Sequence, residues 1–242
     1  MPTRTLATIL LAVALVAASC GDDDEATSTT IPAASEGART VQPITISTPE
    51  YLAFRAQPVA CSAEPPEPAA ELAYTAPDDL GLSGIVTAIV TTSCGDVVIE
   101  LDADTAPATV NSFVFLADQG YFDGTVSHRI VPGFVIQAGD PTARGDGGPG
   151  YLLPDELPAV GFVYARGTVA MANAGANTGG SQFFIVLSDA PLPPAFTAFG
   201  FVTSGLDVLD EIAAVPTTAR AAGLEPSSPL ETVYIVSVET QR

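Results

Sequence analysis

The chain has 242 residues, 47% of them hydrophobic, and its 28 acidic and 8 basic side chains give a formal net charge of -20. The hydrophobic content is sufficient for a full core, while 21 glycines and 21 prolines favour turns and short strands over long helices. Such acidity argues against binding to a nucleic-acid backbone, because that affinity depends largely on cations.

The first 19 residues are typical of an export signal. Arg4 gives a positive start, residues 6–18 form an apolar stretch, and small residues precede Cys20. The stretch is too short to span about 30 Å of hydrocarbon as a helix. The pattern LVAASC resembles a bacterial lipobox, which implies a lipoprotein signal peptide over residues 1–19 and a lipid anchor on Cys20. We therefore expect an extracytoplasmic protein anchored to the bacterial cell membrane; an ordinary secretory signal cleaved nearby is the alternative.

Residues 20–80 are predicted to form a tether and an N-terminal extension. Residues 21–40 combine an acidic run with small and polar residues, so they cannot bury enough apolar surface to fold and are expected to be disordered. More apolar side chains follow, and the sequence leaves open whether residues 41–80 pack on the domain that comes next.

The cysteines also indicate export. If Cys20 carries lipid, Cys61 and Cys94 remain as an even pair, and an oxidising compartment favours a disulfide between them. Two buried free thiols are the alternative.

Residues 81–242 are predicted to form one mainly β domain. Eight apolar runs of strand length are bounded by glycine and proline. They cover residues 85–91, 97–101, 125–130, 134–138, 168–172, 183–187, 198–202 and 233–238. Eight strands at such short intervals predict a closed antiparallel barrel, which would leave no exposed sheet edge.

Two helices interrupt the predicted strands. The first begins near Pro107, a residue type favoured in the first turn, and stops at Gly120. The second covers about residues 205–213 and places Leu206, Leu209 and Ile212 at helical spacing.

Two stretches carry the functional information, HRIVPGFVIQAGD at residues 128–140 and MANAGANTGGSQFF at residues 171–184. They supply an arginine, a glutamine and aromatic side chains, but no plausible nucleophile and no metal-binding cluster. Both stretches resemble the signature of the cyclophilin-type peptidyl-prolyl cis/trans isomerases, and the resemblance extends from about residue 84 to the C-terminus. It implies an eight-stranded β-barrel capped by two α-helices, and acceleration of X-Pro bond rotation without a cofactor.

An arginine suits that reaction. The barrier to rotation, about 20 kcal/mol, is lost amide resonance, and the imide nitrogen regains its lone pair in the twisted state. A donor aimed at this nitrogen binds the twisted form better than either planar isomer. A guanidinium stays charged at any working pH and points its N–H groups in fixed directions.

The resemblance implies a role for each site residue. Arg129 is the expected donor, Gln137 and Phe134 complete the catalytic set, and the main chain of Asn173 would pair with the residues preceding the proline. The other residues expected to bind substrate are His128, Val135, Met171, Ala172, Gln182, Phe184, Leu192 and Phe196.

Strand alternation adds two expectations. Phe183 points away from Phe184 and is expected in the core. Phe134 and Gln137 would lie on opposite faces of one strand, so a turn or bulge must bring both to one cleft, and residues 132–133 are the expected place.

The chain departs from the family pattern at the pocket rim. It has no tryptophan, Pro191 stands near the usual tryptophan position, and Phe196 replaces a histidine. These changes argue against tight cyclosporin binding. The alternative function is therefore a binding module for proline-containing segments, or a chaperone, with little turnover. The expected partners are proline-containing segments of exported proteins, and we expect a monomer.

Three other interpretations carry less weight. GDGGPG at residues 145–150 matches the G-x-G-x-x-G of dinucleotide cradles, but flanking prolines and Asp146 oppose that function, and a mobile loop beside the cleft fits better. Ser181 with His128 as base would suggest a serine hydrolase, which the position of the single histidine next to Arg129 disfavours. A structural envelope protein whose N-terminal extension is the active part is the third.

Overall fold

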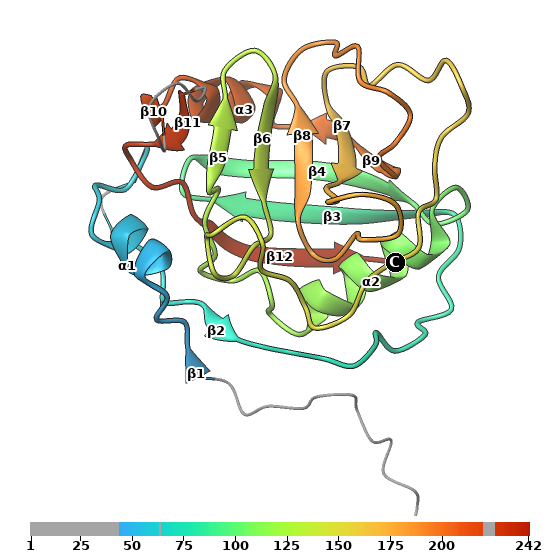
Figure 1. The fold of residues 1–242 in the computed structure, drawn as a ribbon, viewed down its shortest axis with the longest axis horizontal. Helices are drawn as coiled ribbons and strands as arrows, with labels where there is room; N and C mark the ends of the chain where they lie inside the picture. Colours follow the sequence, from blue (N-terminus) through green and yellow to red (C-terminus); the bar gives the residue numbers. More distant parts are fainter. Residues whose placement is uncertain (1–43, 63, 220–225) are drawn as a thin grey trace, which may run out of the picture. The chain divides into compact units, whose positions relative to one another are not determined.

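The computed structural model describes residues 44–62, 64–219 and 226–242 (Figure 1). The predicted signal peptide, the lipid anchor on Cys20 and the tether lie outside the described residues. Among the helices of the described ranges, none is both long enough and apolar enough to cross a membrane.

An eight-stranded antiparallel sheet forms most of the domain, in the order β12-β3-β4-β9-β7-β8-β6-β5. Its strands are β3 (Ile85–Thr92), β4 (Gly95–Asp102), β5 (Arg129–Val131), β6 (Val135–Ala138), β7 (Thr168–Met171), β8 (Phe183–Val186), β9 (Ala198–Ser204) and β12 (Ile235–Gln241). Each falls on one of the eight predicted runs. Figure 1 shows β5, β6, β8 and β7 crossing in front of β3, β4 and β12, so the sheet bends back over itself.

The predicted barrel closure is not present as a continuous strand ladder, because β5 and β12 remain the two edges of the sheet. The chain just before β5 nevertheless bonds to the start of β12. Gly124 N–H donates to Ile235 O at 2.8 Å, Ile235 N–H to Thr125 O at 2.9 Å, and Ser127 N–H to Val233 O at 2.9 Å. The prediction is confirmed for strand number and antiparallel pairing, and the sheet itself is open.

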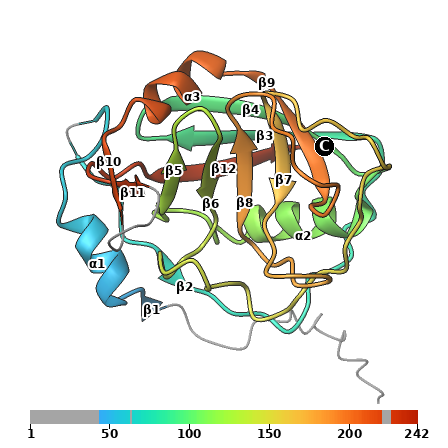
Figure 2. The same cartoon turned by 45° about the horizontal axis from the view of Figure 1, so that its top comes forward.

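Both predicted helices are present, as α2 (Pro107–Asp118) and α3 (Leu206–Ala213), and they lie at opposite ends of the sheet (Figure 2). Gly120 ends the first of them with a φ of 66°, a backbone conformation that glycine adopts without strain. A third helix, α1 (Pro49–Arg55), was not predicted. Its signals were present, since Thr48 caps Tyr51 N–H through its side chain and proline follows at the first position.

The N-terminal extension packs on the domain from residue 44 onward, which answers the question that the sequence left open. Strand β1 (Ile44–Thr45) pairs with β2 (Ala70–Glu71). The fully buried Tyr51 hydroxyl donates to Gly124 O at 2.9 Å and accepts from Ala69 N–H at 2.8 Å. A side chain on Gly124 would overlap the backbone of Glu67, so only glycine lets the extension pass this close.

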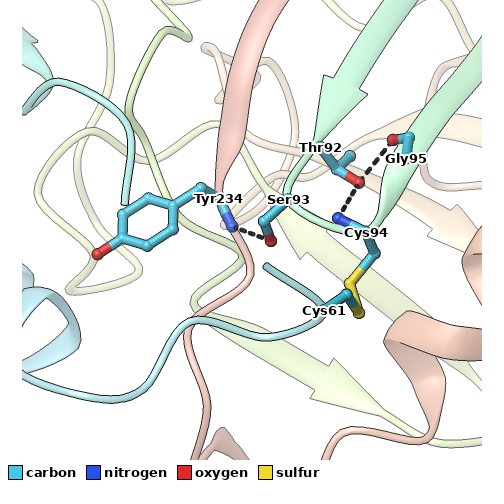
Figure 3. Close-up of a disulfide and its surroundings, with 6 residues drawn as sticks. All are labelled: Cys61, Thr92, Ser93, Cys94, Gly95 and Tyr234. Carbon is cyan, nitrogen blue, oxygen red and sulfur yellow. Dashed lines mark hydrogen bonds between the residues drawn. A yellow bond between two sulfur atoms is a disulfide. The ribbon is translucent and has the colours of Figure 1, made fainter. Parts of the chain in front are cut away.

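The predicted disulfide between Cys61 and Cys94 is confirmed and fastens the extension to the turn between β3 and β4 (Figure 3). Thr92 Oγ1 accepts from Cys94 N–H at 3.1 Å, and Ser93 Oγ accepts from Tyr234 N–H at 3.2 Å. The turn is therefore held by a bond of its own and by one from Tyr234, just before β12. A further small pair, β10 (Thr217–Ala219) with β11 (Pro226–Pro229), lies near β5 (Figure 1).

The main core lies between the sheet and α2 and is centred on aromatic rings. Phe113 of α2 has its ring centroid 5.0 Å from that of Phe122, 5.5 Å from Phe183 and 5.6 Å from Phe199. The prediction that Phe183 belongs to the core is confirmed.

Candidate active site

One row of directly paired residues crosses four strands. Arg129 on β5 lies opposite Gln137 on β6, Gln137 lies opposite Phe184 on β8, and Phe184 lies opposite Ala170 on β7. Residues directly opposite one another project to the same face of a sheet. The register therefore brings the arginine, the glutamine and the phenylalanine to one surface, although they are far apart in sequence.

Phe134 joins this surface through a turn and not through strand alternation. It precedes β6, and its N–H donates to Val131 O at 2.9 Å, while Gly133 has a φ of 73°. The turn at residues 132–133 is thus where the sequence predicted it. The Arg129 guanidinium carbon lies 5.9 Å from the centroid of the Phe134 ring, within the range of a cation–π contact.

A pocket of about 220 Å³ opens at this surface. Its walls are largely aromatic and aliphatic, and Phe184 meets Phe196 edge to face at 5.4 Å between centroids. The lining consists of Arg129, Phe134, Val135, Gln137, Ala172, Asn173, Phe184, Leu192 and Phe196. Nine of the twelve predicted catalytic and substrate-binding residues therefore share one cavity, which is apolar inside with a cation and an amide at its edge.

A chain of hydrogen bonds fixes the polar edge. Arg129 Nη1 donates to Gln137 Oε1 at 3.4 Å, Gln137 Nε2 donates to Gln182 Oε1 at 3.0 Å, and Gln182 Nε2 donates to Gly147 O at 2.9 Å. The Gly147 carbonyl can only accept and the guanidinium can only donate, so the Gln182 amide turns its nitrogen to Gly147 and the Gln137 amide turns its oxygen to Arg129. The guanidinium is thereby tied to the glycine-rich loop.

A second pocket, of about 350 Å³, continues from the first, because Gln137, Ala172 and Asn173 line both. Gln182 lines this second pocket, together with the glycine-rich loop at residues 145–148. The two cavities therefore form one continuous groove along the row of paired strands.

The glycine-rich loop wraps around a carboxylate of the protein itself. Asp140 is fully buried and accepts from Thr142 N–H and Oγ1, both at 2.7 Å, and from the N–H groups of Gly145 and Gly147 at 2.5 and 3.2 Å. A side chain on Gly147 would overlap Asp140. The glycines thus serve the close approach of a buried anion, and no helix follows the motif as a dinucleotide site requires.

Residues 87–240 match the family model described as cyclophilin type peptidyl-prolyl cis-trans isomerase/CLD. The chain belongs to this family. The cyclophilin is 42% identical over 168 residues to the "Probable peptidyl-prolyl cis-trans isomerase B" of Mycobacterium tuberculosis, covering 63% of this chain and 54% of that protein. The chain thus spans about half the length of that relative. It is also 42% identical over 148 residues to "Peptidyl-prolyl cis-trans isomerase ppi1" of Schizosaccharomyces pombe, covering 60% of this chain and 96% of that protein.

Solved structures agree with the family assignment. A cyclophilin type peptidyl-prolyl cis-trans isomerase of Cryptosporidium parvum superposes on the chain with a TM-score of 0.60 at 30% identity, covering 65% of this chain and 98% of that one. A second structure of that protein, determined in the presence of the dipeptide Ala-Pro, gives a TM-score of 0.59 at 31% identity, covering 64% and 99% of the two chains.

Tyr164 is a residue of the cyclophilin site that sequence reasoning missed. Its ring is fully buried, and its hydroxyl donates to Phe196 O at 2.6 Å and accepts from Phe196 N–H at 3.3 Å. Burial raises the pKa of the Tyr164 hydroxyl, so it stays protonated and able to donate. Asn173 Nδ2 donates to Ala195 O at 2.8 Å, so the segment carrying Phe196 is held from two sides. The only signal for Tyr164 in the sequence was a lone tyrosine in the loop before β7.

Two residues expected to contact substrate lie behind the cyclophilin pocket. His128 is 2% exposed and Met171 is 3% exposed, and neither lines the two pockets described above. His128 lies next to Arg129 at the start of β5, and Met171 belongs to the main core. The arrangement therefore assigns both of them to supporting the site instead of touching the substrate.

The serine-hydrolase alternative does not fit the geometry. The Ser181 hydroxyl donates to Gly139 O at 2.6 Å and lies 3.1 Å from the Tyr121 hydroxyl. It is thus engaged with groups other than His128. Among the described residues there is also no group of three or more His, Cys, Asp or Glu side chains placed to hold a metal ion.

Proposed function

We propose that this cyclophilin is a peptidyl-prolyl cis/trans isomerase that accelerates X-Pro rotation without covalent chemistry. The observation that carries the proposal is the Arg129 guanidinium at the edge of a small apolar pocket, hydrogen-bonded to Gln137 and stacked near Phe134. The pocket would hold the proline ring while the guanidinium donates to the pyramidal imide nitrogen. The donor would therefore bind the twisted form more tightly than either planar isomer.

The arginine accounts for part of the acceleration. A hydrogen bond from a charged donor contributes about 1.5–3 kcal/mol, and each tenfold of rate requires about 1.4 kcal/mol of preferential binding. Arg129 can therefore contribute roughly 10- to 150-fold. The remainder would come from holding the chain on either side of the bond.

The main chain of Asn173 is suited to that holding role. Within the part of the chain that the structure describes, its N–H and C=O make no intramolecular hydrogen bond, and the residue lines both pockets. An extended peptide could pair with both groups as an added strand does. The Cryptosporidium parvum cyclophilin was determined in the presence of the dipeptide Ala-Pro, which supports a proline-containing ligand for this chain.

We further propose that the enzyme acts on exported proteins as a monomer, from outside the cytoplasm. The support is the lipobox-like pattern before Cys20, with a signal peptide over residues 1–19, together with the Cys61–Cys94 disulfide, a bond typical of oxidising compartments. The lipid would anchor the chain to the membrane. We also infer that the bonds between residues 124–127, just before β5, and residues 233–235, at the start of β12, close the sheet into a barrel.

The proposed activity is tested by cis-to-trans relaxation of a short Ala-Pro peptide after a solvent jump. Arg129→Ala should lower kcat/KM by about 10- to 150-fold. Arg166→Ala is the matched control, because Arg166 is half-exposed, pairs with Asp210 at 2.8 Å and lies outside the pocket lining. If Arg129→Ala turns over the peptide as fast as the control, the proposed role of Arg129 is wrong. If the unmodified enzyme does not exceed the uncatalysed rate, the activity itself is wrong.

A binding module or chaperone with little turnover is the second candidate, and one surface feature favours it. The loop before β7 exposes Val160, at 96%, with Phe162 and Val163 beside it. The Phe162 ring contacts Tyr164 at 5.0 Å, which in turn contacts Phe196 of the pocket. Apolar surface next to the groove suits the holding of unfolded chains. This function would be unchanged by Arg129→Ala in an aggregation assay, whereas isomerase turnover would fall.

A further inference from the structure

A third cavity, of about 470 Å³, adjoins the groove on the side away from the proline pocket. Tyr151 and Leu152 line both this cavity and the second pocket, and Leu152 stands 66% exposed between them. One wall is formed by residues 75–79 of the N-terminal extension, and the opposite wall by the start of α2. The extension wall lies before residue 87, where the match to the family model begins.

The extension wall is anchored at both of its ends. Before it, Tyr74 N–H donates to Pro149 O at 2.8 Å, and the Tyr74 ring meets Phe115 edge to face at 5.1 Å. After it, the Asn111 side chain of α2 accepts from Leu80 N–H and donates to the carbonyl of Asp78, both at 2.8 Å. The cavity is therefore a built feature of the fold.

The lining selects against anions and for apolar groups. Pro77, Pro107 and Pro154 contribute apolar rings without N–H donors. The helix start next to them is already satisfied, because Glu156 accepts from Ala108 N–H and from the next N–H of α2, both at 2.9 Å.

The rim of the cavity carries negative charge. Asp78 and Asp79 are both exposed on the extension wall, and the whole chain has a formal net charge of -20. A basic side chain beside an apolar one would therefore be attracted to this position.

We infer that the extension adds a third subsite to the peptide groove, and that the client chain itself occupies it. The subsite would take an apolar side chain next to a lysine or arginine. An extended chain advances about 3.3 Å per residue, and the third cavity follows the second pocket along the groove, so the preferred residue lies several residues from the proline. This inference rests on the proposed isomerase function.

The test is a series of peptides with one Ala-Pro core. The core is lengthened residue by residue on the N-terminal side in one series and on the C-terminal side in another, with Leu-Lys at the growing end. We expect kcat/KM, and the affinity measured by fluorescence anisotropy, to rise about tenfold in one series when Leu-Lys reaches one position several residues from the proline. A smooth change without a step in both series would overturn the subsite.

Two variants, Ala76→Trp and Asp79→Asn, test whether the third cavity causes the tenfold rise, and a third variant is the control. Ala76→Trp fills the cavity from the extension wall and should abolish the step while the short Ala-Pro peptide is turned over normally. Ala159→Trp is the matched control, since Ala159 is exposed and lines none of the three cavities. Asp79→Asn keeps an oxygen for its bond from Gly81 N–H and should reduce only the preference for lysine over norleucine.

The outcomes separate the subsite from the isomerase function. If the step persists in Ala76→Trp, the subsite is wrong even though turnover is intact. If short peptides are not turned over but the anisotropy step is present and lost in Ala76→Trp, the isomerase proposal fails and the subsite stands. If Ala76→Trp instead changes the sedimentation coefficient of the protein without changing the step, a second copy of the chain occupies the cavity and the inference is wrong.

Discussion

The Tyr51 hydroxyl should be a measurable link between the N-terminal extension and the cyclophilin domain. Tyr51→Phe removes one oxygen and leaves the ring in place, so the packing of α1 is retained. Two buried backbone groups then lose this partner, the C=O of Gly124 and the N–H of Ala69. An unsatisfied buried polar group costs about 1–3 kcal/mol. Because the change opens almost no cavity, the two unsatisfied groups dominate, and we expect the free energy of unfolding to fall by about 2–6 kcal/mol.

The loss is large enough to measure by two routes. For a domain of this size, about 1 kcal/mol lowers the melting temperature by about 2–4 °C, so Tyr51→Phe should melt about 4–24 °C lower. Urea unfolding followed by circular dichroism should show a lower midpoint with an unchanged slope.

The neighbouring residue gives the control. Leu52→Ala changes the same helix at a side chain that is 51% exposed, and should cost less than about 0.5 kcal/mol. If Tyr51→Phe is no less stable than Leu52→Ala, the two hydrogen bonds do not hold the extension, and residues 44–80 are not an integral part of the folded domain.

Three further outcomes are expected. Tyr164→Phe removes both hydrogen bonds to the Phe196 backbone, so KM for an Ala-Pro peptide should rise about 3- to 10-fold with a smaller change in kcat. If the variant and the unmodified protein have the same KM and kcat, Tyr164 does not position Phe196. Cys61→Ser should lower the free energy of unfolding by about 2–5 kcal/mol in urea, while reductant should destabilise only the unmodified protein. The pKa of Asp102 is lowered chiefly by the Thr105 side chain, so its carboxylate stabilises the fold at neutral pH, and this contribution is lost as the pH falls below 3.8. Asp102→Asn should therefore be less stable than the unmodified protein at neutral pH only. An equal loss of stability in acid would contradict the assignment.

Much of this protein was predictable because the signals are local. All eight strands of the sheet and both predicted helices of the cyclophilin domain were predicted from apolar periodicity and from glycine and proline within single stretches of the chain. The turn before Phe134 was predictable because alternation alone would have separated Phe134 from Gln137. Most of the residues that line the pocket could be predicted because two short motifs contain them.

The tertiary structure decided which of those residues meet. His128 and Met171 belong to the same motifs as Arg129 and Asn173, yet strand register turns them toward the interior. Tyr164 reaches the site because its hydroxyl lies against a backbone segment 32 residues away. No local sequence pattern predicts a contact between residues so far apart in the chain.

The N-terminal extension shows the same division. Its sequence contains apolar side chains after residue 41, but it does not show whether they pack on the domain. That packing depends on the absence of a side chain at Gly124 and on the two hydrogen bonds of the buried Tyr51 hydroxyl. The sequence by itself determined the strands, the helices and the chemistry of the two motifs, since each depends on neighbours along the chain. The disulfide pair followed from the even number of cysteines that remain if Cys20 carries lipid. Only the tertiary structure decided the open sheet edges, the fixing of the extension and the third cavity, because each depends on sheet order and on contacts between distant segments.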